Sequence, residues 1–100
     1  MVESRKTNKK TIKPRKDIAG SMVEDLRIKL LKVINQDINE LAIDMKGINV
    51  IDSSGLGVLI AARNSLDQNG GLLSLTNVPE NIGDFLKVIG IDRYLNTNVA

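Results

Sequence analysis

The residues of this chain that can do chemistry gather in one segment, 51–57, with the sequence IDSSGLG. Asp52 or Ser53 can cap a helix that begins here, which puts Ser54 in its first turn. A phosphoserine carries about −1.5 to −2 charges at neutral pH. A helix N-terminus tolerates that charge because its dipole and free N–H groups favour anions. Phosphorylation of Ser54 would therefore preserve the fold and make the surface beside Asp52 strongly anionic, which would repel a docked partner.

Two glycines follow the serines, and each costs a helix roughly 1 kcal/mol relative to alanine. That cost suggests a compensating use, such as the close approach of another backbone. We therefore predict a partner-binding surface formed by Asp52, Ser53, Ser54, Gly55, Leu56 and Gly57. Asp-Ser-Ser-Gly is also an ordinary cap and turn sequence, so the spacing alone fits a purely structural role as well. The glycines are not a dinucleotide-binding fingerprint, because Ile60 stands where a third glycine would be and no phosphate-loop lysine follows.

The amino-acid composition excludes the commonest catalytic mechanisms. The 100 residues contain no cysteine and no histidine, which excludes Ser-His-Asp and Cys-His catalysis, disulfides and cysteine metal sites within this chain. Asp44 and Asp52 are candidate metal ligands, but two carboxylates without a defined cluster are more typical of a strand end and a helix cap. We therefore expect a protein that is not an enzyme and that needs neither a cofactor nor a metal.

The charge is unevenly distributed along the chain. The net charge is +2, but residues 1–16 hold seven basic side chains against one acidic, a net +6, and residues 17–100 carry a net −4. A basic arm can bind phosphates nonspecifically. With one Phe and one Tyr for stacking, we expect no specific nucleic-acid binding. Residues 1–10 lack an apolar period and are predicted to be a flexible arm, with a single domain over 11–100.

The pattern of the remaining chain predicts alternating strands and helices. The charged first residues and the absence of a long apolar run argue for a cytoplasmic protein that does not contact a membrane. A capping box, Ser21 with Glu24, precedes apolar residues at helical spacing. The predicted helices are Met22–Gln36, one from Ser53 to Asn69, and one from Pro79-Glu80 to Gly90. The predicted strands lie within 11–16 (where Pro14 confines the strand to an edge or an end), Glu40–Met45, Leu72–Thr76 and Tyr94–Thr97. This order predicts an α/β fold with a small, mixed or mostly parallel sheet and helices packed on it.

The sequence over about residues 16–98 resembles the STAS domain, the fold of bacterial anti-sigma-factor antagonists. The resemblance rests on a hydrophobic strand followed by DSSGLG, a helix, two glycines and a further strand. It implies that Ser54 is the phosphoacceptor and that Asp52 is the aspartate opening the motif. It also implies two partners, a serine kinase that is also an anti-sigma factor and a PP2C-type phosphatase. The unphosphorylated form would capture the kinase and free the sigma factor, and phosphorylation would release the kinase.

Other functions remain open at this point. Some STAS proteins are adapters in chemotaxis or other signalling complexes without serine phosphorylation, and this chain is compatible with that role. A small nucleotide hydrolase is disfavoured because His, Cys and a phosphate loop are missing. Residues 1–16 also depart from the family, because they are basic where its members usually have a hydrophobic hairpin. We expect a monomer or a weak dimer.

Overall fold

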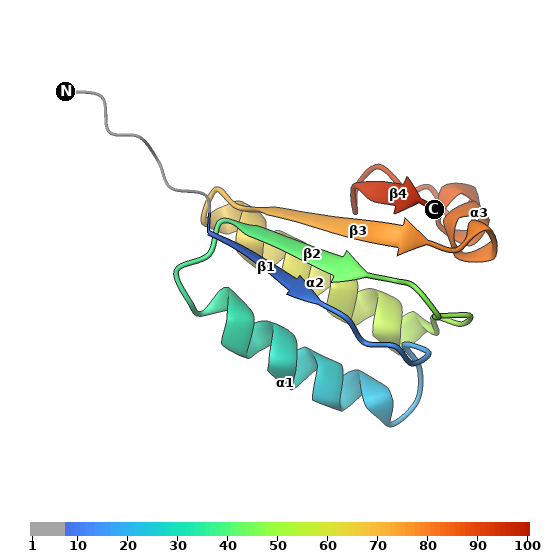
Figure 1. Cartoon of the computed structure of the whole chain (residues 1–100), viewed down its shortest axis with the longest axis horizontal. Coiled ribbons are helices and arrows are strands. Elements are labelled where there is room, and N and C mark those ends of the chain that lie inside the picture. Colours follow the sequence, from blue (N-terminus) through green and yellow to red (C-terminus); the bar gives the residue numbers. More distant parts are fainter. Residues whose placement is uncertain (1–7) are drawn as a thin grey trace.

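The computed structural model describes residues 8–100 (Figure 1). Four strands and three helices alternate along this part of the chain, as the sequence pattern predicts. Their bounds are β1 (Lys9–Ile12), α1 (Met22–Ile34), β2 (Glu40–Asp44), α2 (Ser53–Gln68), β3 (Leu72–Val78), α3 (Glu80–Val88) and β4 (Thr97–Val99).

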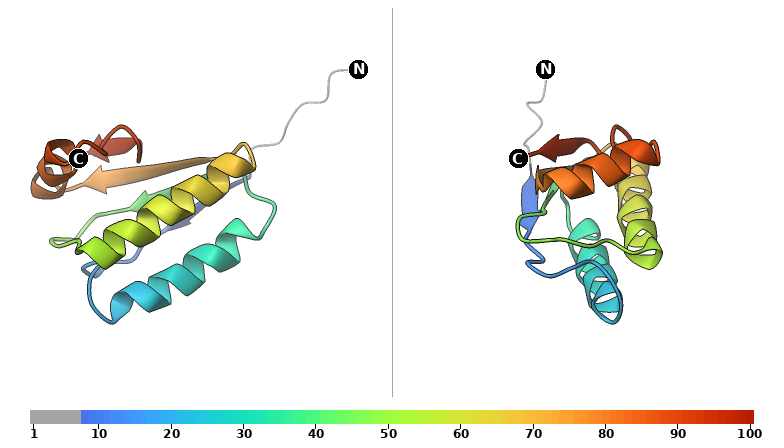
Figure 2. Two further views of the ribbon diagram at one scale, coloured as in Figure 1. Left: turned by 180° about the vertical axis from the view of Figure 1, so that it is seen from behind. Right: turned by 90° about the vertical axis from the view of Figure 1, so that its right-hand side faces the viewer.

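The strands form one sheet in the order β1-β2-β3-β4, and every neighbouring pair is parallel. The predicted α/β class with a mostly parallel sheet is therefore confirmed. Helices α1 and α2 lie side by side on one face of the sheet, and α3 lies beside β4 (Figures 1 and 2). Because all strands run the same way, the connections that leave β1, β2 and β3 all emerge at one end of the sheet, where sites in such folds are found.

The core fills the space between the sheet and the two long helices. Strand register places Ile12, Ile43 and Leu75 in one row across three strands, and each is at most 7% exposed. Leucines of α1 and α2 at helical spacing, such as Leu30 and Leu59, are equally buried and belong to the same cluster. Alternate strand residues point to the opposite face of the sheet, since side chains change sides at every position.

The start of α1 differs from the sequence expectation. The predicted capping box is wrong, because Ser21 makes no side-chain cap bond and Glu24 is instead hydrogen-bonded to Arg27. Ser21 adopts helical dihedral angles, with φ −65° and ψ −21°, whereas a capping residue is typically extended so that its hydroxyl can reach the first N–H groups. The preceding Gly20, at φ +61°, makes the turn into the helix. The helix also ends two residues earlier than predicted, at Ile34.

The terminal strands also differ from their predicted positions. Strand β1 begins at Lys9, because Lys9 pairs with Glu40 and Lys10 with Leu41. These two residues therefore do not belong to a flexible arm, and residues 1–7 of that predicted arm lie outside the described residues. The predicted strand within 11–16 overlaps β1 only at its last two residues. Its true start was not predictable from apolar residues, because backbone pairing at an edge needs few of them and only Ile12 of β1 is buried. As predicted, β1 lies at the sheet edge, and it ends before Pro14.

The last strand is Thr97–Val99 rather than Tyr94–Thr97, because residues 92–96 form turns. Tyr94 lies against Arg63 of α2, with the guanidinium carbon 3.9 Å from the ring centroid, and Asn96 has a positive φ. Both features fit a turn that docks on α2. Strand β3 is two residues longer than predicted and reaches Val78, while β2 ends at Asp44 rather than Met45.

Truncation of two of the three leucines of β3 should distinguish the contribution of core burial from that of strand propensity. Leu75 is completely buried and Leu72 is 48% exposed. We expect Leu75→Ala to lower the free energy of unfolding by about 2–5 kcal/mol, since it leaves a cavity in the core. Leu72→Ala should change it by no more than about 0.5 kcal/mol. Urea denaturation followed by circular dichroism measures both, and equal losses would contradict this description of the core.

Candidate functional site

The predicted motif lies where two connections meet at the carboxyl end of the sheet. The chain after β1 runs beside the chain that leads into α2, and Ile18 forms an isolated parallel bridge with Ile51. The Ile18 N–H donates to the Val50 carbonyl at 2.9 Å, and the Asp52 N–H donates to the Ile18 carbonyl at 3.2 Å. Segment 17–20 is therefore fixed against the start of α2, although some 30 residues separate the two in sequence.

Asp52 joins these two segments through its carboxylate. It is the N-cap of α2 in extended backbone conformation, as one of the two predicted alternatives proposed, while Ser53 is the first helical residue rather than the cap. One carboxylate oxygen accepts from the Gly55 N–H and from the Ser54 hydroxyl, both at 2.8 Å. The other accepts from the Gly20 N–H at 3.0 Å. The Gly20 and Gly55 N–H groups and the Ser54 hydroxyl together lower the pKa of Asp52, so the carboxylate is ionised at neutral pH.

Ser54 lies in the first turn of α2 and is exposed, as predicted. Its hydroxyl is not free in orientation, because it donates to Asp52. Ser53 is exposed beside it, Leu56 is half-buried and Gly57 is exposed. Five of the six predicted partner-binding residues, all except Gly55, are therefore wholly or partly accessible at this helix end.

The two glycines of the motif differ in what surrounds them. Gly55 is buried, and a Cβ placed on it would lie 2.2 Å from the Ile18 carbonyl oxygen. A Cβ placed on Gly57 would meet nothing within 4 Å. The close backbone approach that sequence analysis assigned to a partner is therefore, at Gly55, an approach within the domain itself. Only Gly57 leaves open space at the surface.

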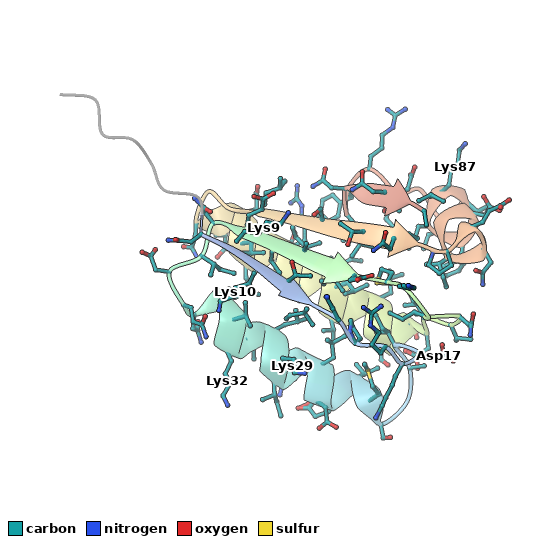
Figure 3. The ribbon with its side chains drawn as sticks, viewed as in Figure 1. Lys9, Lys10, Asp17, Lys29, Lys32 and Lys87 are labelled. Carbon is teal, nitrogen blue, oxygen red and sulfur yellow. The ribbon has the colours of Figure 1, made fainter. Side chains whose placement is uncertain are left out.

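Asp17 is a site residue that the sequence analysis missed. Its carboxylate accepts from the backbone N–H groups of Asn49 at 2.7 Å and Val50 at 3.1 Å, so it ties the connection after β1 to the loop after β2 (Figure 3). The available signal was an aspartate in a loop next to an apolar residue, which is typical of side chains that bond to nearby backbone. That signal does not identify a backbone partner more than 30 residues away.

Asp44, the other carboxylate considered for a metal, is engaged by protein donors. It is 7% exposed and accepts from the Lys46 N–H at 3.0 Å and the Asn77 amide at 3.1 Å, with the Arg15 guanidinium at 3.4 Å. The Lys46 N–H and the Asn77 amide, followed by Arg15 and Lys13, lower the pKa of Asp44. Asp44 and Asp52 therefore accept hydrogen bonds from separate sets of donors. Within residues 8–100 no group of three or more potential ligands is arranged to hold a metal ion.

An exposed apolar surface adjoins the site. Val50 and Phe85 are 49% and 43% exposed and line one shallow hollow with Ile82. The Asn81 amide donates to the Asn49 carbonyl at 3.2 Å, which holds the start of α3 to the loop that leads into α2. Exposed apolar side chains beside an exposed polar helix end are typical of a surface that binds another protein.

Sequence comparison identifies the family. A family model of the STAS domain matches residues 2–99. The chain belongs to the STAS domain family. The motif 52–57, at the start of α2, lies inside the matched range, and the four parallel strands with three helices agree with the STAS fold.

Solved structures agree with this assignment at the level of the fold. Eleven solved chains match, among them the crystal structure of a sulfate transporter family protein from Wolinella succinogenes. Its TM-score is 0.67 at 23% sequence identity, over 89% of this chain and 70% of that chain. No curated protein matches. Among the described residues of this STAS domain, no helix is long and apolar enough to cross a membrane.

The glycine pair of this STAS domain provides a matched test. Gly55→Ala should lower the free energy of unfolding by about 1–3 kcal/mol, because the new methyl group must displace the Ile18 backbone. Gly57→Ala should raise it by about 0.5–1 kcal/mol, because alanine favours the helix and meets open space. Urea denaturation measures both. A harmless Gly55→Ala would show that segment 17–20 is not held against α2.

The stability of this STAS domain should fall in acid. The pKa values of Asp44 and Asp52 are lowered in the folded state, so their contribution is complete above the unfolded value of about 3.9 and is lost as the pH falls below it. We expect the midpoint of thermal unfolding to drop as the pH falls below about 4. Asp44→Asn should be less stable at neutral pH and should show a shallower drop. An identical pH profile in the variant would contradict this assignment.

Proposed function

We propose that this STAS domain is an anti-sigma-factor antagonist that captures a serine-kinase anti-sigma factor when Ser54 is unphosphorylated and releases it on phosphorylation. The observation that carries the proposal is the placement of Ser54. Its hydroxyl is exposed in the first turn of α2 and is hydrogen-bonded at 2.8 Å to the ionised Asp52 carboxylate. The hydroxyl is thus accessible to a kinase and held in one orientation.

Phosphorylation would reverse the interaction between these two side chains. The phosphoryl group of ATP would join the Ser54 oxygen, the hydroxyl proton would leave, and ADP would depart. The bond that Ser54 donates to Asp52 would then be lost and replaced by repulsion between a phosphate and a carboxylate. The free N–H groups of the first turn of α2 favour the new anion, so the helix would persist while the surface changes.

The change would extend beyond the serine, because Asp52 also holds Gly20. A phosphate that repels the Asp52 carboxylate would weaken the contact between α2 and segment 17–20. A partner docked across both segments would lose charge and shape complementarity together. This supports a release mechanism that needs no catalytic group in the domain itself.

The proposed partner surface consists of the accessible part of the motif and the apolar side chains beside it. Ser53, Leu56 and Gly57 supply the polar and small residues around Ser54, while Val50 and Phe85 supply apolar area. In this proposal the kinase adds the phosphate, a PP2C-type phosphatase removes it, and the domain itself catalyses nothing. The setting is the bacterial cytoplasm, where sigma factors regulate transcription.

The experiment that tests this function combines mass measurement with binding. We expect the protein from its native cells to carry a phosphate-sized increment that changes with growth condition and is absent in Ser54→Ala. Ser54→Asp should bind the cognate kinase at least tenfold more weakly than the wild type, and Ser54→Ala should bind normally but resist release by ATP. Ser65→Asp, at a partly exposed serine far along α2 from the motif, is the matched control and should bind normally.

Two results would contradict the proposal: no phosphate on Ser54 in any condition, and equal kinase affinity for the wild type and Ser54→Asp. They would favour the alternative, an unphosphorylated STAS adapter in a chemotaxis or other signalling complex. The fold is compatible with other settings, since the similar crystal structure is described as a sulfate transporter family protein. An unbiased search for binding partners would then be the next measurement.

A further inference from the structure

The free edge of the sheet at β1 is a second surface, independent of Ser54. In the sheet order β1 has a neighbour on one side only, β2. No other strand among residues 8–100 pairs with its outer side. The backbone groups on that side can therefore accept or donate hydrogen bonds to an added strand.

Unpaired lysines surround this edge. We define the lysine edge as Lys9 and Lys10 of β1, Lys16 after it, and Lys29 and Lys32 of α1. All five are exposed, and none forms an ion pair with another described residue. Figure 3 shows Lys10, Lys29 and Lys32 along the side of the molecule formed by β1 and α1, while Lys87 lies far away on α3. The lysine edge is thus a concentrated positive surface on a domain whose residues 17–100 are net negative.

A groove between β1 and α1 runs through this positive surface. Ile12, Pro14, Met22 and Leu26 supply its apolar lining, and Lys16, Lys29 and Asp25 supply its charged groups. A strand added beside β1 would direct every second side chain toward this groove. The groove suits an apolar side chain flanked by acidic ones, because the apolar lining is bordered mainly by positive charge.

Charge complementarity selects among the possible occupants of the edge. A second copy would bring its own Lys9 and Lys10 against these lysines, and lysines on edge strands are a common protection against such pairing. We propose that the lysine edge binds an acidic, extended segment of a partner protein, which pairs with β1 as an added strand and places an apolar side chain in the groove.

The test uses a labelled nine-residue peptide in which valine alternates with glutamate, titrated into the full chain by fluorescence anisotropy. We expect saturable binding that weakens steeply with salt. The double variant Lys10→Glu, Lys29→Glu should bind at least tenfold more weakly. Lys87→Glu is the matched control and should bind within twofold of the wild type. Thermal unfolding of each variant checks that the exposed substitutions leave the fold intact.

Two further probes separate strand addition from simple charge attraction. The same peptide with a central proline keeps its charge but cannot pair along its length, and it should bind at least fivefold more weakly. Amide hydrogen exchange should slow at residues 9–13 when the peptide binds. Equal binding of the proline peptide, equal loss in Lys87→Glu, or binding of single-stranded DNA or phosphatidylserine vesicles in place of the peptide would overturn the proposal.

Discussion

The contact between Asp52 and the two segments it joins is the constraint on which the site depends. One carboxylate caps α2, orients Ser54 and holds Gly20, while backbone pairing of Ile18 with the strand-like residues 50–52 runs alongside. Because a single ionised group satisfies donors from two distant segments, the loop after β1 and the start of α2 form one surface. Under the proposed function, a change in charge at Ser54 would therefore act on both.

The motif combines two opposite requirements at adjacent positions. Gly55 must lack a side chain because the Ile18 carbonyl lies where a Cβ would be, so it contributes to packing rather than to recognition. Ser54, one residue earlier, is exposed and contributes to the surface. Neighbouring side chains on a helix point about 100° apart, and at the start of α2 this rotation leaves Gly55 facing the domain and Ser54 facing outward. A short motif can thus be both a fold determinant and a site.

Much of the fold and part of the site can be predicted from the sequence, and the failures have physical causes. Apolar periodicity predicts α1, α2, β2 and β3, because burial selects side chains at a regular spacing. The Asp52 cap was predictable because capping is local. The hydrogen bonds of Asp17 and the close approach of Ile18 to Gly55 could not be predicted, because they join residues more than 30 positions apart through backbone atoms. The capping box at Ser21 failed because Gly20 turns the chain differently from what the local pattern implies.

The two proposed surfaces, the start of α2 and the lysine edge, differ in whether their charged groups already have partners. The site at the start of α2 is a helix N-terminus with a paired carboxylate, where one added phosphate changes the sign of the interaction with a neighbour. The lysine edge has no such partner among the described side chains, so its charge persists until an outside group neutralises it. An edge strand with a single buried residue, Ile12, contributes little to the core, and its lysines reduce pairing with identical chains. What disfavours self-association at β1 is therefore the feature that makes an acidic strand the complementary occupant.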